Sequence, residues 1–146
     1  MTSVDANILL YSFSEASPHH AKAHGFIEGL AQQSDVAISE LVLVELYTLL
    51  RNPAVLTSPL GPSEAVDVVQ KYRRHPRWML LGFDEDTVEL HENLWELAGR
   101  KKFGRRQIYD VRLALSLRRQ CVTELATANV KHFSDAGFVR VWNPVD

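Results

Sequence analysis

Short apolar segments alternate with longer amphipathic segments along the whole chain, and this alternation limits the fold more than any other feature. The apolar segments end near Asp5 and lie near residues 36–38, 78–83, 122–127 and 138–142. Helical periodicity between them predicts a helix after most strands. Consecutive strands separated by helices pair in parallel, because parallel neighbours need a long crossover. The pattern predicts an α/β domain of three layers, with helices on both faces of a parallel sheet.

Capping residues and prolines set the expected ends of the helices. Ser39 and Ser63 are expected to cap the second and third of them. A turn or short helix is expected after Asp5. We expect helices over residues 18–33, 40–50, 64–75, 84–102 and 107–119.

The 146 residues are expected to form one domain, residues 1–146. The formal net charge of −2 neither favours nor excludes a nucleic-acid partner, which would need a local basic patch. The single cysteine, Cys121, allows no internal disulfide, and we expect a buried thiol in a reducing cytoplasm. The N-terminus lacks a basic signal-peptide region, and no apolar run is long enough to cross a membrane.

Glu45 is the only charged residue in the segment 41–50, LVLVELYTLL. A helix of this composition is apolar nearly all round, so it is expected to be buried. A buried carboxylate without a partner is costly and shifts its pKa or binds a cation. The alternatives are that Glu45 bonds a neighbouring arginine or lies at the wet edge of the helix.

Asp110 and Asp5 are also unusually placed. Asp110 lies on the apolar stripe of its helix, with Leu113, Ala114 and Leu117 at helical spacing. Stabilisation of the helix N-terminus is an alternative role for Asp110, and an Asx-turn is one for Asp5. Ligands of open α/β sheets bind at the carboxyl ends of the strands, where Asp5 and Glu45 are expected. Three carboxylates there suit a hard cation such as Mg²⁺, which can activate water and neutralise a phosphate.

Three acidic motifs resemble those of PIN domains, in order and over essentially the whole chain. VDANILLY, from residue 4, is similar to their opening, and SELVLVELYTLLRNPAVL, from residue 39, resembles the second acidic motif of toxins of the VapC type. GRRQIYDVRLALSLRRQCVTELATANVKHF, from residue 104, resembles the third, and the ending VRVWNP is also similar.

The resemblance implies a PIN-like fold with a central five-stranded parallel sheet, and an endoribonuclease that uses Mg²⁺ or Mn²⁺ on structured cellular RNA. It implies a toxin of a type II toxin–antitoxin system, with a cognate antitoxin in the active site and a homodimer. The family's metal-binding positions fall on Asp5, Glu45 and Asp110, with Asp5 and Asp110 as metal ligands. A fourth catalytic position, often Asp, is Asn129 here, so the site has three negative charges and binds a second metal less well.

Supporting roles near the metal are implied for Asn7 and Thr127. A basic cluster precedes Asp110, and its members Arg105 and Arg106 are candidates to hold RNA phosphates. A solvated basic loop, or an internal partner for the carboxylates, is an equally open interpretation of that cluster. The alternative function is a non-catalytic PIN-like module that regulates a partner or binds RNA, and Asn129 keeps this alternative open.

Overall fold

A computed structural model describes residues 1–146 and contains one five-stranded sheet in which every paired strand is parallel. The strands are short, and the middle ones are largely buried because helices cover both faces of the sheet. They are β1 (Thr2–Val4), β2 (Val36–Ser39), β3 (Met79–Leu81), β4 (Glu124–Ala126) and β5 (Arg140–Trp142). Their order in the sheet is β3-β2-β1-β4-β5, so β1 lies in the middle.

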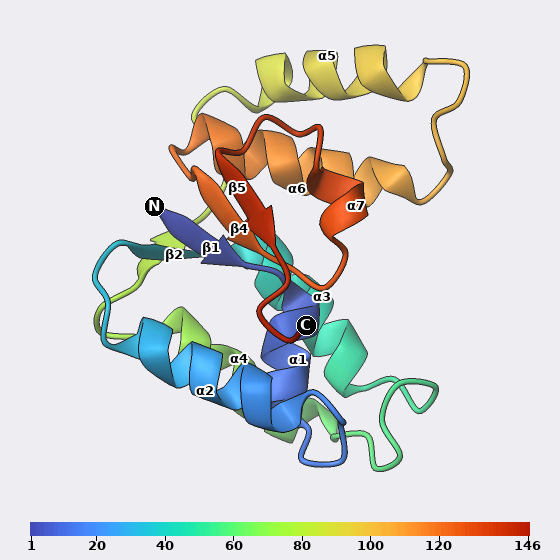
Figure 1. Cartoon of the computed structure of the whole chain (residues 1–146). Helices are drawn as coiled ribbons and strands as arrows, with labels where there is room; N and C mark the ends of the chain where they lie inside the picture. Colours follow the sequence, from blue (N-terminus) through green and yellow to red (C-terminus); the bar gives the residue numbers. More distant parts are fainter.

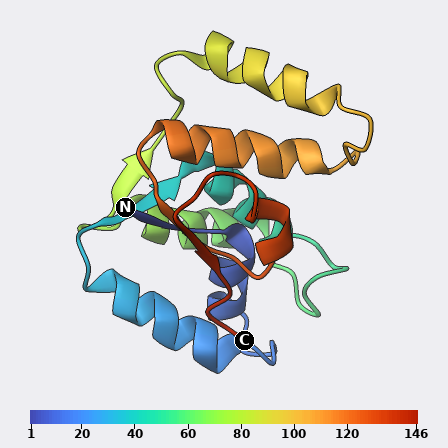
Figure 2. The same cartoon turned by 45° about the horizontal axis from the view of Figure 1, so that its top comes forward.

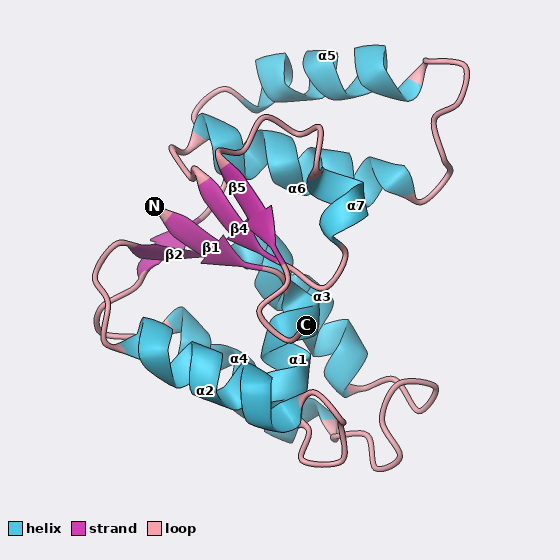
Figure 3. Cartoon of the chain, in the orientation of Figure 1, coloured by secondary structure: helices cyan, strands magenta, loops and turns pink.

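Seven helices form two layers around this sheet, which confirms the predicted three-layer architecture (Figures 1 and 3). The helices are α1 (Ala6–Phe13), α2 (His20–Ala31), α3 (Glu40–Leu50), α4 (Pro62–Arg73), α5 (Thr87–Ala98), α6 (Gln107–Arg119) and α7 (Val130–Phe133). Helices α1 to α4 contact one another in one layer, whereas α5, α6 and α7 form the other. None of these helices has the length and apolar character needed to cross a membrane.

The strand order explains why the layers divide in this way. The chain builds outward from β1 to β2 and β3, then crosses back to add β4 and β5 on the other side of β1. Because such crossovers are right-handed, reversing the direction moves the connecting helices to the opposite face. The reversal leaves a switch point between the carboxyl ends of β1 and β4, where open α/β sheets bind their ligands.

The hydrophobic core lies between the sheet and both helix layers, and its main cluster contains 26 buried residues. Helix α5 is outside this cluster. Its buried side chains Leu90 and Leu94 face α6, so α5 packs on the outer side of that helix (Figure 2). Arg119 at the end of α6 forms ion pairs with Asp84, which precedes α5, and with Glu89 in its first turn. Helix α5 is thus attached to α6 by the apolar side chains on one of its faces and by the ion pairs of Arg119.

Several predicted boundaries need correction. Helix α5 covers Thr87–Ala98 rather than residues 84–102, because the Asp86 side chain accepts a hydrogen bond from the Glu89 amide and caps it. Helix α4 begins at Pro62 after Gly61, so Ser63 lies inside the helix and is not its cap. Ser39 does cap α3, since its hydroxyl accepts a hydrogen bond from the Leu41 amide.

Cys121 was expected to be buried, and this is wrong: its side chain is exposed. It has a φ of 67°, which is the left-handed conformation that ends many helices. The Cys121 amide donates to the Arg118 carbonyl, and the Val122 amide donates to the Leu117 carbonyl. This pattern is a Schellman motif at the end of α6. Cys121 therefore forms part of the turn that ends the helix and does not pack in the core.

Candidate active site

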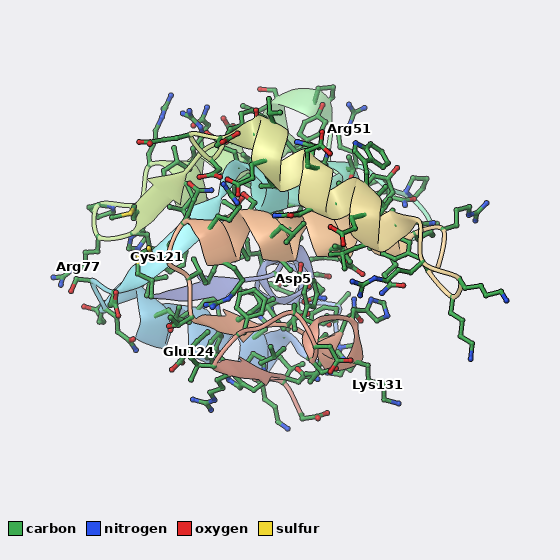
Figure 4. All side chains as sticks on the ribbon, turned by 90° about the horizontal axis from the view of Figure 1, so that it is seen from above. Asp5, Arg51, Arg77, Cys121, Glu124 and Lys131 are labelled. Atoms are coloured by element: carbon green, nitrogen blue, oxygen red, sulfur yellow. The ribbon has the colours of Figure 1, made fainter.

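The candidate site lies at the switch point, at the carboxyl ends of β1 and β4. Asp5 follows β1 directly and caps α1, and its backbone amide donates to the carbonyl of Ala126 at the end of β4. The two strand ends are therefore joined at Asp5. Figure 4 shows Asp5 near the middle of the molecule when the chain is seen from above.

Asp5 is held by a dense set of hydrogen bonds. Its side chain is buried, and the Oδ1 atom accepts from the Ala6 amide at 2.8 Å. The Oδ2 atom accepts from the Thr127 hydroxyl at 2.6 Å and from the Asn7 amide group at 3.1 Å. Asn7 also accepts a hydrogen bond from the Ala128 amide, which ties α1 to the turn after β4. These contacts fix the carboxylate in one orientation.

Glu45 reaches the same region from α3. The prediction that this helix is buried all round is wrong, because Val44 is 64% exposed, and Glu45 and Thr48 are also exposed. Only one face, with Val42, Leu43, Leu46 and Leu50, packs in the core. The structure gives Glu45 no ion pair with an arginine, so of the two alternatives it favours the solvent-facing edge.

Asp110 lies in the first turn of α6, and its Oδ2 atom is 2.8 Å from Nδ1 of His132 on α7. Both side chains are partly open to solvent, with 30% of the Asp110 side chain and 57% of the His132 side chain exposed. His132 was not singled out from the sequence. No helix or strand was expected around it, so nothing placed a residue 22 positions away against Asp110.

The pKa values of Asp5 and Glu45 depend on the charges of neighbouring carboxylates. Burial raises the pKa of Asp5, and the charge of Asp110 raises it further, against the lowering effect of its hydrogen bonds. Although the Glu45 side chain is exposed overall, protein atoms crowd around its carboxylate, and this partial loss of hydration raises its pKa to about 7. The charges of Asp5 and Asp110 add to this, while Arg106 lowers it. Residues far apart in the sequence therefore share one negative field, although burial is the largest cause of both pKa shifts.

The remaining candidates surround this field. Asn129 is exposed at the start of α7, and its backbone amide donates to the Thr127 hydroxyl at 3.0 Å. Arg106 directly precedes α6 and acts on Glu45, whereas its neighbour Arg105 has no ion pair with any carboxylate.

No group of three or more His, Cys, Asp and Glu side chains is already arranged to hold a metal ion. Both oxygens of Asp5 accept hydrogen bonds from protein donors, and the Asp110 carboxylate faces His132. The donor set consists of carboxylate oxygens, which suits a hard divalent cation. A cation would also relieve the repulsion that raises the pKa values of Asp5 and Glu45.

The parallel sheet, its switch point and the acidic centre define a class of protein, the PIN domain. The sequence profile of this family matches residues 3–138, and the chain belongs to the PIN domain family. Within the family, the chain is 46% identical to Ribonuclease VapC24 of Mycobacterium tuberculosis, in strains CDC 1551 and H37Rv. The match covers 145 residues, which are 99% of this chain and 97% of the relative.

Two solved structures have the same fold. One is VapC20 of M. tuberculosis, described as a toxin that cleaves the sarcin–ricin loop, with a TM-score of 0.69 and 19% identity over 95% of this chain and 97% of that chain. The other is VapBC2 of Rickettsia felis bound to a promoter DNA fragment, with a TM-score of 0.65 and 17% identity over 97% of both chains. At these identities the likeness establishes the fold alone.

Proposed function

We propose that the chain is a metal-dependent endoribonuclease, the toxin of a type II toxin–antitoxin system, formed by one PIN domain over residues 1–146. The observation that carries this proposal is the shared field of Asp5, Glu45 and Asp110 at the switch point of the sheet. The extensive identity to a relative named as a ribonuclease supports the choice of RNA as substrate. The single cysteine suits a reducing cytoplasm, where such RNA is found.

Asp5 and Asp110 would hold the metal, Mg²⁺ or Mn²⁺, with Glu45 beside it and the amide oxygen of Asn129 as a neutral fourth group. When bound, the ion would activate a water molecule and neutralise charge on the scissile phosphate. With three negative charges rather than four, the site favours one tightly bound ion over two.

The protein's own groups have separate tasks in this proposal. Thr127 and Asn7 fix Asp5, so the carboxylate needs no reorganisation when a ligand arrives. Glu45 has a pKa of about 7 in the metal-free protein, and a bound cation would lower this pKa, so its carboxylate would be ionised and able to accept a proton in the loaded enzyme. A group of this kind suits the transfer of a proton from water to the leaving oxygen.

The direct test is to incubate the purified protein with total RNA in Mg²⁺, in Mn²⁺ and in EDTA. We expect discrete fragments in either metal and intact RNA in EDTA. The Asp5→Asn variant, checked by circular dichroism, is the control for a contaminating nuclease. Equal cleavage by the variant, or cleavage that persists in EDTA, would contradict the metal mechanism.

A second candidate is a non-catalytic module that binds RNA or a partner. Two observations favour it: the carboxylates are not preassembled for a metal, and Asn129 replaces an acidic group. A metal titration followed by calorimetry separates the two. Micromolar to millimolar Mg²⁺ binding that Asp5→Asn removes supports the enzyme, and no binding with intact RNA supports the module.

The proposed partners are a cognate antitoxin and a second copy of the chain. Val44 is exposed next to Glu45, so an apolar partner surface can adjoin the acidic centre. An inhibitor should insert an arginine, whose planar cation pairs with carboxylates and competes with the metal. Light scattering at micromolar concentration tests the homodimer, and a monomer mass would exclude it. Titrating Mg²⁺ into the purified complex tests the inhibitor, since excess metal should weaken the complex.

A further inference from the structure

Helix α7 is only one turn long, yet it is held at both ends. Just before its start, the Asn129 amide donates to the Thr127 hydroxyl at 3.0 Å, and that hydroxyl donates to Asp5. At its end, Phe133 is fully buried in the main core cluster. Within the turn, the His132 amide donates to the Asn129 carbonyl at 2.9 Å. The backbone that carries His132 is therefore fixed relative to Asp5.

The His132 side chain extends from α7 to the first turn of α6, where its Nδ1 atom lies 2.8 Å from Oδ2 of Asp110. A carboxylate oxygen can only accept a hydrogen bond, so Nδ1 of the neutral imidazole carries the proton in this contact. A chain of hydrogen bonds through Thr127, the backbone of α7 and His132 thus connects the two proposed metal ligands, Asp5 and Asp110.

Asp110 keeps one oxygen free in this arrangement. Its Oδ1 atom accepts no hydrogen bond from the protein, and no arginine or lysine forms an ion pair with its carboxylate. A cleft of about 790 Å³ between α6 and α7 has Asp110 and His132 in its wall, so solvent and ions can reach the carboxylate. An arginine could occupy both oxygens and compete with a cation, whereas one imidazole N–H holds a single oxygen. The histidine can therefore orient the carboxylate without neutralising it.

We propose that His132 is a positioning residue for the divalent cation, because it holds Asp110 through Oδ2 and leaves Oδ1 for the ion. This inference rests on the proposed function and deepens it. Hydrogen-bond partners of metal ligands set the orientation of those ligands, and their loss weakens metal binding by roughly 10- to 100-fold. His132 would do for Asp110 what Thr127 does for Asp5.

Magnesium binding followed by calorimetry tests this role directly. The titration is run at about pH 8, where imidazole side chains are ordinarily neutral, so that loss of a positive charge does not enter the result. His132→Ala should weaken Mg²⁺ binding about tenfold. His132→Asn should stay within about threefold of the wild type, because its amide nitrogen is as many bonds from Cα as Nδ1 and donates in its place. His132→Gln carries its amide further out and should behave like the alanine variant.

His24→Ala is the matched control. His24 also contacts a carboxylate, Glu28, at 3.2 Å, but it lies on α2 in the opposite helix layer. This variant should bind Mg²⁺ like the wild-type protein. Melting temperatures without metal show whether each variant is folded. If the alanine variant at position 132 does not fold, the difference between the asparagine and glutamine variants decides the question.

Two further measurements separate positioning from a purely structural role. In the metal-free protein, nitrogen NMR of the His132 ring should place the proton on Nδ1, as the contact with Asp110 requires. In RNA cleavage, His132→Ala should be slow at limiting Mg²⁺ and should recover most of its kcat at saturating Mg²⁺. Its KM for RNA should remain that of the wild type, because the side chain acts through the metal ligand.

Wild-type Mg²⁺ affinity in His132→Ala, equal losses in the asparagine and glutamine variants, or a proton on Nε2 would each overturn this inference and leave the proposed function standing. If the wild-type protein itself binds no Mg²⁺, the proposed function fails and this inference fails with it.

Discussion

Asp5 and Asp110 carry the same functional group, yet the structure surrounds them in different ways. The inner half of the site, Asp5 with Asn7 and Thr127, is buried in a closed set of hydrogen bonds. The outer half, Asp110 with Glu45, Asn129 and His132, lies on helices, partly open to solvent. The inner half can fix a ligand in place, and the outer half can rearrange around it. This division explains how a site can collect negative charge without being preassembled for a metal.

The strongest test of this comparison is Asp5→Asn, which removes the fixed charge of the inner half. We expect at least about a thousandfold loss of RNA cleavage, since a bound metal supplies several kcal/mol of stabilisation. The fold should be retained, because the substitution also removes a buried charge. The readouts are the cleavage rate and the melting temperature with and without Mg²⁺. A melting temperature that still rises with Mg²⁺ as in the wild type would show that Asp5 does not hold the ion.

Thr127→Val tests whether the inner half is rigid because of its hydrogen bonds. The change keeps the shape but leaves Asp5 and the Asn129 amide without a hydroxyl partner. Leaving buried groups unsatisfied should lower the free energy of unfolding by about 1–3 kcal/mol. Thr127→Ser, which keeps the hydroxyl, should lose much less. Equal urea midpoints for the valine and serine variants would mean that the bond contributes nothing.

Asn129→Asp tests the outer half by adding a charge where the side chain is exposed. We expect Mg²⁺ to bind about tenfold more tightly, on the order of the attraction between partly screened charges. Stability without metal should change little. Asn52→Asp, an exposed site at the end of α3, adds the same charge elsewhere and is the control for net charge. Unchanged Mg²⁺ affinity in calorimetry would show that residue 129 does not reach the ion.

The smallest expected effect is on the pH dependence of metal-free stability, because the Glu45 side chain is exposed and solvent screens much of its contribution. The pKa of Glu45 is about 7 in the folded protein, against an ordinary value of 4.5. Between these values the folded state binds more protons than the unfolded state, so stability falls as the pH rises. Glu45→Gln should therefore lose less stability than the wild type between pH 5 and 7, with a residual slope from Asp5. Parallel melting curves against pH for the two proteins would contradict this.

The sequence alone was enough to predict the layered α/β fold and helix α6, because apolar periodicity and turn residues are local signals. It was also enough to single out Asp5, Glu45 and Asp110, each of which is a charge in an apolar context. The joint field of these residues depends on strand order, which was not predicted, since the resemblance implied only a five-stranded parallel sheet.

What the sequence missed depends on contacts between distant segments. Because residues 41–50 are almost all apolar, α3 was predicted to be buried, but one face of it is exposed to solvent. The segment itself does not indicate which of its faces a neighbouring element covers. The contact of His132 with Asp110 required α7, a single helical turn too short to leave a periodic pattern. The cleft between α6 and α7 is lined in part by the loop after α5, and the first residues of this loop were predicted to continue the helix.

The bond between Asp5 and Thr127 joins residues that are 122 positions apart. A ribosome makes Asp5 long before Thr127, and β1 cannot gain β4 as a neighbour until β4 has been made. The centre is thus incomplete in every nascent chain, even if α1 to α4 have already folded on their side of β1. An enzyme that destroys cellular RNA would be harmless while the segment between Asp5 and Thr127 is being translated, and its activity could begin only after Thr127 has been made.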